Sequence, residues 1–369
     1  MSTRPGPSGA VLSSFLRRTL PVLPLHARPA NWRVWLWQML CGGRHGAALA
    51  AVATAGSLLK AALDSPDLDK RCLALMDVAL MLGTMIYQVT FTSRRAQTRR
   101  MLEDLVVLAE ELEADATEDD LQDLRATVRG MRAVRNVTAF FVVTIPSIMI
   151  MGPVLTGELA MSFYPKPQGV LWYLVCLTQD VATVTCPLCV NAIVFTLLLV
   201  SSGAASLART ISRRMQTCSG EQAVLRMARA HHLLMDLGDR MATTYYLTLF
   251  VLISGLLATS LLATFNVATG SFETYTALLV PAPLLFYYNI ATISDNLATS
   301  TLGVSEGVWG SPWTEESVPV RRVILNMMTR AQKACSVRVP LLGGVTLPVF
   351  KDSMRQWYSF LQMIRSVNG

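Results

Sequence analysis

The chain has 369 residues, of which 52% are apolar and 15% charged, and its mean hydropathy is +0.41. Soluble domains carry about 25% charged residues, so this chain has too little charge to coat the two or three water-facing domains that its length would allow. Its 22 Gly and 17 Pro residues are too few for a collagen-like or low-complexity chain. The composition therefore indicates an integral membrane protein.

Seven stretches of the sequence are long and apolar enough to cross a membrane as helices, which takes roughly 17–25 residues each. They are 46–63, 72–92, 134–156, 170–203, 244–266, 274–303 and, with the weakest pattern, 344–367. We therefore expect an all-α membrane protein with seven transmembrane helices.

The positive charges predict how these helices are oriented. The N-terminal segment and every second connection after it hold 25 Lys and Arg residues when Arg135 at the start of the third stretch is included, whereas the connections on the opposite side hold Lys70, Arg71 and Lys166. Because Lys and Arg accumulate on the cytoplasmic side, the N-terminus is expected inside and the C-terminus outside. Receptors that couple to G proteins have the opposite orientation.

The cytoplasmic connections have helical patterns. Apolar residues recur at helical spacing from Met101 to Leu112, beside acidic residues. Thr117 and the acids after it form the pattern of a capping box. No proline occurs from Leu225 to Phe265, so one helix could pass through the membrane and project into the cytosol. We expect a packed cytoplasmic layer that joins subunits.

The sequence offers little support for an enzyme or a metal site. Cys186 and Cys189 form a C-x-x-C inside an apolar run without a second pair, which favours small buried hydrophobes. His231 and His232 are adjacent, so on a helix they point in different directions. Common phosphate-binding, hydrolase and zinc-protease motifs do not occur. We expect no catalytic residues, no cofactor, no metal and no nucleic-acid partner.

The last apolar stretch carries a polar stripe. Lys351 and Arg355 share one helix face, and Ser359, Gln362 and Ser366 continue it. Such a stripe on an otherwise apolar helix suits a pore-lining segment. A packed helix whose charged ends reach toward water would show the same pattern.

The C-terminal region resembles insect odorant receptors over about residues 285–367. The similarity rests on SEGVWGSPWTEESVPVRRVILNMMTRAQKACSV, a Gly-Gly step, Leu347, Phe350 and Tyr358-x-Phe360. Ala331-Gln332-Lys333 matches the family's Q-K step, and Trp309 stands where Tyr is commoner. Outside this region, the resemblance rests on the number of spans, the inverted orientation and the length.

This resemblance implies a subunit of an odorant-gated, non-selective cation channel in the plasma membrane of sensory dendrites. Four subunits would surround a central pore, joined by cytoplasmic helices. The chain lacks the long insertion of the co-receptor between spans 4 and 5, so it resembles a ligand-binding subunit that opens in a heterotetramer with that co-receptor. The implied pore and gate residues are Gln362, Met363, Ser366, Val367, Lys351 and Arg355.

The implied parts are a cytoplasmic N-terminal segment (1–45), helices 1–6 (46–303), a cytoplasmic anchor helix (304–342) and the pore-lining helix (343–369). In the family, a small volatile odorant sits among the outer halves of spans 2, 3, 4 and 6. Those halves supply Met76, Leu80, Ile150, Met151, Trp172, Tyr173, Cys176, Tyr275, Leu279 and Phe286. Such apolar walls suit a weakly polar ligand, and contact with the lipid bilayer or helix packing is the alternative role.

Two alternative functions are a gustatory-type ligand-gated channel and a secondary transporter. A gustatory-type ligand-gated channel would carry a different signature near its C-terminus, of the form T-Y-x-x-x-x-Q-F. A secondary transporter would show a repeated half with broken helices near the midplane of the membrane. Pro146, Pro187, Pro281 and Pro283 do not form a matched pair of helix breaks.

Overall fold

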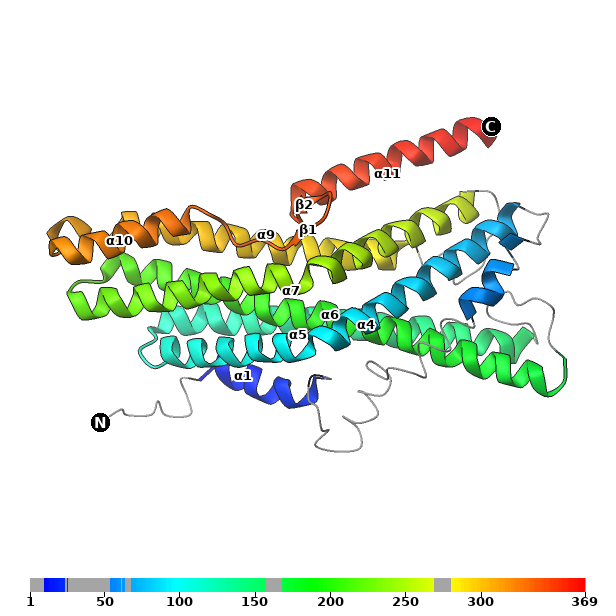
Figure 1. The fold of residues 1–369 in the computed structure, drawn as a ribbon, viewed down its shortest axis with the longest axis horizontal. Helices are drawn as coiled ribbons and strands as arrows, with labels where there is room; N and C mark the ends of the chain where they lie inside the picture. Colours follow the sequence, from blue (N-terminus) through cyan, green and yellow to red (C-terminus); the bar gives the residue numbers. More distant parts are fainter. Residues whose placement is uncertain are drawn as a thin grey trace.

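The computed structural model describes residues 10–23, 25, 54–60, 62–63, 68–156, 168–268 and 280–368. Nearly all of this part is helical (Figure 1). The helices are α1 (Leu12–Thr19), η1 (Leu20–Val22), α4 (Leu68–Glu113), α5 (Glu118–Thr156), α6 (Val170–Thr217), α7 (Glu221–Ala268), α9 (Pro281–Trp309), η2 (Trp313–Glu315), α10 (Val318–Ala331) and α11 (Leu347–Asn368).

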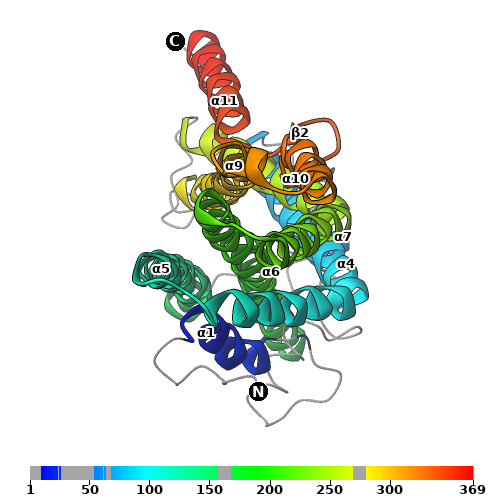
Figure 2. The same ribbon diagram turned by 90° about the vertical axis from the view of Figure 1, so that its left-hand side faces the viewer.

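Helix α6 lies at the centre of the bundle. It packs against α4, α5, α7 and α9, and the end-on view shows these helices around it (Figure 2). Its side chains from Ile193 to Ile211 include many that are fully buried, because apolar and small residues make up nearly all of this stretch. The core therefore runs along α6.

Close packing between α6 and α9 depends on a glycine. A Cβ atom added to Gly307 would lie 2.3 Å from the backbone oxygen of Ser212, whereas one added to Gly303 would meet nothing within 4 Å. The Ser212 hydroxyl donates a hydrogen bond to the carbonyl oxygen of Gly303 (2.8 Å). Small residues thus let the two backbones approach closely.

The helices continue well past the predicted membrane spans. Helix α4 has 46 residues, so it is about 69 Å long, and it joins the second predicted span to the predicted amphipathic helix without a break. The predicted apolar stripe is confirmed, since Met101, Leu105 and Leu112 are buried. Helix α7 has 48 residues, as the proline-free run predicted.

Two helical stretches among the described residues are long and apolar enough to cross a membrane by length and composition. They are Pro187–Thr217 and Glu221–Val267.

The connections between α4 and α5, α6 and α7, and α9 and α10 lie at the same end of the bundle (Figure 1, left). At the first of them the predicted capping box is formed, because the backbone N–H of Asp120 donates to Thr117 Oγ1 (3.3 Å) and that of Thr117 to Asp120 Oδ2 (3.4 Å). This end carries most of the Lys and Arg residues.

The stretch 304–342 is more divided than the single anchor helix that we expected. It contains the end of α9, η2, α10 and β1 (Arg338–Val339), and β1 forms a short antiparallel hairpin with β2 (Gly343–Gly344), which lies just beyond the stretch. The turn needs positive φ angles at Leu341 (68°) and Gly343 (71°), of which the second is natural for glycine. The hairpin leads directly into α11.

Candidate functional site

Eight of the ten predicted ligand-binding residues lie on α4, α5, α6 and α9, toward the ends opposite the α4–α5 and α6–α7 turns. Phe286 is buried, with 6% of its surface exposed, whereas Tyr173 is 70% exposed and Met151 is 51% exposed. Trp172 and Cys176 are half-buried. The structure thus places Phe286 inside the bundle and Tyr173 on the surface of the single subunit.

The other predicted ligand-binding residues are less fully described. Met76, Leu80 and Ile150 lie on α4 and α5, for which the structure describes only the backbone at these positions. Tyr275 and Leu279 lie outside the described residues.

Directly after Phe286, α9 contacts the last helix. The ring of Tyr287 packs edge-on against that of Phe350 on α11, with centroids 5.1 Å apart, and Tyr288 contacts the same ring at 5.5 Å. The hydroxyl groups of Tyr287 and Ser353 share a hydrogen bond of 3.2 Å. This α9–α11 junction (Tyr287, Tyr288, Phe350 and Ser353) lies one residue from a predicted ligand-binding position.

The residues of this junction are not among the ligand-binding or pore residues that the sequence predicts. Two signals were present, namely the adjacent tyrosines in the sixth predicted span and the Phe350 that belongs to the C-terminal resemblance. Nothing in the sequence, however, indicates that these aromatic rings meet.

Beyond the junction, α11 leaves the bundle (Figures 1 and 2). Leu347, Phe350 and Met354 pack against the core in its first turns. All of the predicted stripe is exposed on this subunit: Lys351, Arg355, Ser359, Gln362 and Ser366. Met363 is 56% exposed, and at Val367 the structure describes only the backbone.

At the end of the bundle where α4 turns into α5, three arginines of α6 bind the acids of α5. Arg213 and Arg214 both pair with Asp120 at 3.1 Å, and the Asp120 side chain is only 2% exposed. Arg209 pairs with Asp123 at 3.0 Å and also donates to Ser300 Oγ on α9 (3.1 Å). This arginine network fixes three helices to one another.

The N-terminal helix α1 is held to the same end by a buried acid. The Oε1 atom of Glu113 accepts hydrogen bonds from the backbone N–H groups of Val11 (3.2 Å), Leu12 (2.6 Å) and Ser13 (3.3 Å). A carboxylate suits these unpaired N–H groups at the start of a helix. Burial nevertheless raises the pKa of Glu113, and the hydrogen bonds only partly oppose that shift.

His231 lies buried in the first half of α7. Its side-chain Nε2 has no hydrogen-bond partner in the described part of the chain. Burial, followed by the nearby charges of Arg330 and His232, lowers the pKa of His231 from 6.5 to about 4. The imidazole is therefore neutral at physiological pH. No group of three or more His, Cys, Asp or Glu that could hold a metal ion occurs among the described residues.

The fold is similar to that of a solved insect olfactory receptor. The structure of OR5 from Machilis hrabei matches with a TM-score of 0.76 at 13% sequence identity, covering 96% of this chain and 97% of that one. The structure of the same receptor in complex with eugenol matches equally well and is covered to 98%.

The sequence itself matches the family described as 7tm Odorant receptor over residues 71–358. This match covers most of the chain, including the long helices α4–α9, the α9–α11 junction and the first half of α11. The family is one of receptors rather than of enzymes, and its members are membrane proteins. The chain therefore belongs to the 7tm odorant receptor family.

Proposed function

We propose that this chain is the ligand-binding subunit of an odorant-gated, non-selective cation channel in the plasma membrane. It would cross the membrane seven times with the N-terminus in the cytoplasm, and it would open together with a co-receptor in a heterotetramer. Membership of the odorant receptor family supports the receptor role.

One observation carries the channel part of the proposal. Helix α11 has a continuous polar stripe, yet all five residues of that stripe are exposed, and beyond its first turns the helix stands apart from its own bundle (Figure 1). Polar and charged groups are costly in lipid unless they face water or protein. Four such helices around a water-filled pore would give each stripe a suitable environment.

The proposed gating path runs through the α9–α11 junction. A small apolar molecule bound beside Phe286 would shift α9, and the neighbouring Tyr287 would pass that movement to Phe350 and Ser353 on α11. The outer part of α11 would then move away from the pore axis. Gln362, Met363, Ser366 and Val367 are the proposed gate, with Lys351 and Arg355 nearer the cytoplasm.

The ligand is proposed to be a small, weakly polar volatile molecule. The receptor of Machilis hrabei to which this chain is similar was solved in complex with eugenol. The walls that we assign to this pocket are Met, aromatic and aliphatic side chains, which favour apolar contact over hydrogen bonding.

A cysteine scan of the last helix tests this proposal. With Ser366→Cys and the co-receptor expressed together, a charged thiol reagent applied during odorant pulses should reduce the current. Gln168→Cys is the matched control, because Gln168 is exposed just before α6, outside both the proposed pore and the predicted span 170–203. Unchanged current in Ser366→Cys, or equal loss in both variants, would contradict a pore lined by α11.

A further inference from the structure

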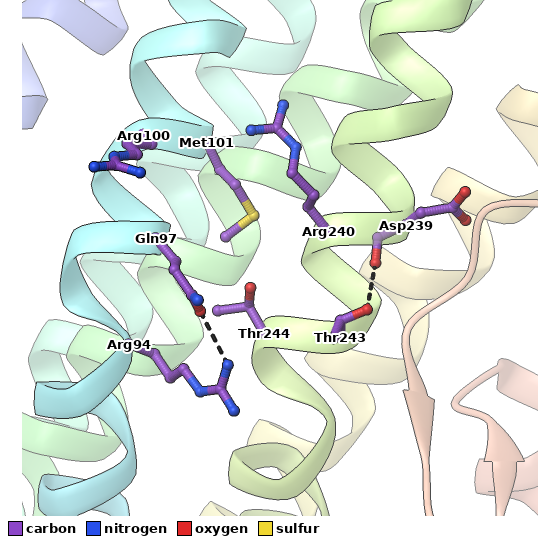
Figure 3. Close-up of a pocket in the computed structure, with 8 residues that line it drawn as sticks. All are labelled: Arg94, Gln97, Arg100, Met101, Asp239, Arg240, Thr243 and Thr244. Carbon is purple, nitrogen blue, oxygen red and sulfur yellow. Dashed lines mark hydrogen bonds between the residues drawn. The ribbon is translucent and has the colours of Figure 1, made fainter.

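Two neighbouring clefts open along α7 near its cytoplasmic half. The first has a volume of about 340 Å³, lies between α4 and α7, and is lined by Arg94, Arg100 and Arg240 (Figure 3). The second has a volume of about 450 Å³ and lies between α7 and the segment that follows α10, where Lys333 and Arg338 line it. Both clefts fall within the size of small-molecule sites, roughly 300–1,000 Å³.

The clefts form one continuous surface. Asp239 and Thr243 of α7 line both of them, so the two share a wall. In Figure 3, Arg94 extends from α4 toward α7, and Arg240 extends from the facing wall. The Asp239 side chain points away from α4 in Figure 3, and Asp239 also lines the second cleft.

Most of the positive charge on this surface is uncompensated. Asp239 pairs with Arg330 (2.5 Å), and Arg240 pairs with Asp104 (2.8 Å). The remaining cations, which we call the α7 basic surface, are exposed, and none of them forms an ion pair with another described residue. They are Arg94, Arg100, Lys333 and Arg338.

The α7 basic surface lies where three parts of the chain meet the predicted inner boundary of the membrane. Arg94 comes two residues after the predicted span 72–92, and Arg338 precedes the predicted span 344–367. On α7, the clefts end at Thr244 and Tyr246, where the predicted span 244–266 begins. Clusters of Lys and Arg at this depth attract the anionic lipids of the cytoplasmic leaflet, by about 1 kcal/mol for each residue.

We propose that the α7 basic surface binds the headgroup of a phosphoinositide that carries phosphate groups on its inositol ring. Two cation-lined clefts with a common wall fit a headgroup with several phosphates better than one with a single phosphate. A bound headgroup joins α4 and α7 to the hairpin from which α11 starts. This inference rests on the membrane orientation proposed above.

Photo-crosslinking tests the proposal without a measurement of current. The full chain is placed in phosphatidylcholine vesicles that contain photoactivatable phosphatidylinositol 4,5-bisphosphate, and labelled peptides are identified by mass spectrometry. We expect labels within 94–101, 239–244 and 333–338. A phosphatidylserine probe should label these peptides more weakly, and soluble inositol trisphosphate should compete poorly, because it lacks the membrane anchor.

Four substitutions remove the surface: Arg94→Gln, Arg100→Gln, Lys333→Gln and Arg338→Gln. Labelling of the combined variant should be more than about tenfold weaker than that of the unmodified chain, because each cation is expected to attract the lipid. The matched control removes four exposed cytoplasmic arginines elsewhere, by Arg18→Gln, Arg129→Gln, Arg229→Gln and Arg322→Gln, and should keep the labelling. The double variants R94Q/R100Q and K333Q/R338Q provide the same comparison if the fourfold variant does not fold.

Equal labelling of the two fourfold variants would overturn the proposal, as would labelling by the phosphatidylserine probe that is as strong as labelling by the phosphoinositide probe. Odorant-evoked current is recorded in parallel from the unmodified chain expressed together with the co-receptor. Specific labelling without any current would support the lipid site and contradict the channel function. Current without specific labelling would support the channel function and contradict the lipid site.

Discussion

The hydroxyl groups of Tyr287 and Ser353 lie 3.2 Å apart and join α9 to α11. Tyr287 is fully buried, and its ring also contacts Phe350. Because the preceding residue, Phe286, is a predicted ligand-binding residue, this junction connects the proposed binding site to the proposed pore helix within two neighbouring residues of α9.

The first prediction concerns this hydrogen bond. Tyr287→Phe keeps the ring contact but removes the hydroxyl, so movement of α9 should reach α11 less effectively. A hydrogen bond of this kind contributes about 1 kcal/mol, which corresponds to a rise of about fivefold in the half-maximal odorant concentration. Tyr288→Phe is the matched control, since the structure gives the Tyr288 ring a contact with Phe350 but no hydrogen bond to α11. Similar dose–response curves for the two variants would contradict this coupling.

The second prediction concerns the contact between α6 and α9. Gly307→Ala places a Cβ atom against the backbone of Ser212, which cannot rotate away, so the helices must separate. We expect a loss of about 1–3 kcal/mol in the free energy of unfolding. Gly303→Ala has open space and replaces glycine inside a helix, so it should be neutral or stabilising by up to about 1 kcal/mol. Thermal unfolding in detergent measures both, and equal midpoints would show that α6 and α9 are not closely packed.

A third prediction follows from the buried His231. In the folded chain the pKa of His231 is about 4, whereas in the unfolded chain it is 6.5. Because the unfolded chain binds this proton first, the free energy of unfolding is unaffected by His231 above pH 6.5. It falls by an amount on the order of 3 kcal/mol as the pH is lowered from 6.5 to about 4.

His231→Leu should remove this part of the acid sensitivity, because no proton can bind at that position. His232→Leu should retain it, since His232 is exposed. Unfolding midpoints measured between pH 7 and pH 4 separate the two variants. Parallel pH profiles for them would mean that His231 is not kept neutral by burial.

The fourth prediction concerns the arginine network. Asp120→Asn removes the charge that Arg213 and Arg214 share, and leaves those arginines without their buried partner. The expected loss of stability is about 3 kcal/mol. Glu118→Gln breaks the exposed pair between Glu118 and Arg125 and should cost less than about 1 kcal/mol. If chemical or thermal unfolding gave equal losses, the network would not contribute as a buried cluster.

Local features of this fold could be predicted from the sequence. The buried stripe from Met101 to Leu112 follows from helical periodicity, and the cap at Thr117 follows from the polar residues around it. The length of α7 follows from the absence of proline. In each case the residues that determine the structure are close together in the chain.

Features that depend on distant residues could not be predicted. Glu113 accepts the N–H groups of α1 from about 100 residues away, and Tyr287 meets Ser353 across 66 residues. The hairpin before α11 was missed because each of its strands has only two residues, too few for an alternating pattern. The sequence identified Phe286, but the neighbouring contact that links it to α11 required the packed structure.

The most direct test of the channel function is whole-cell current from cells that express this chain with and without an insect odorant co-receptor, during application of a broad odorant panel. Surface labelling of the chain serves as the control for expression. We predict a fast inward cation current that requires both subunits and persists when G proteins are blocked. Absence of current in every pairing, despite surface expression, would contradict the account.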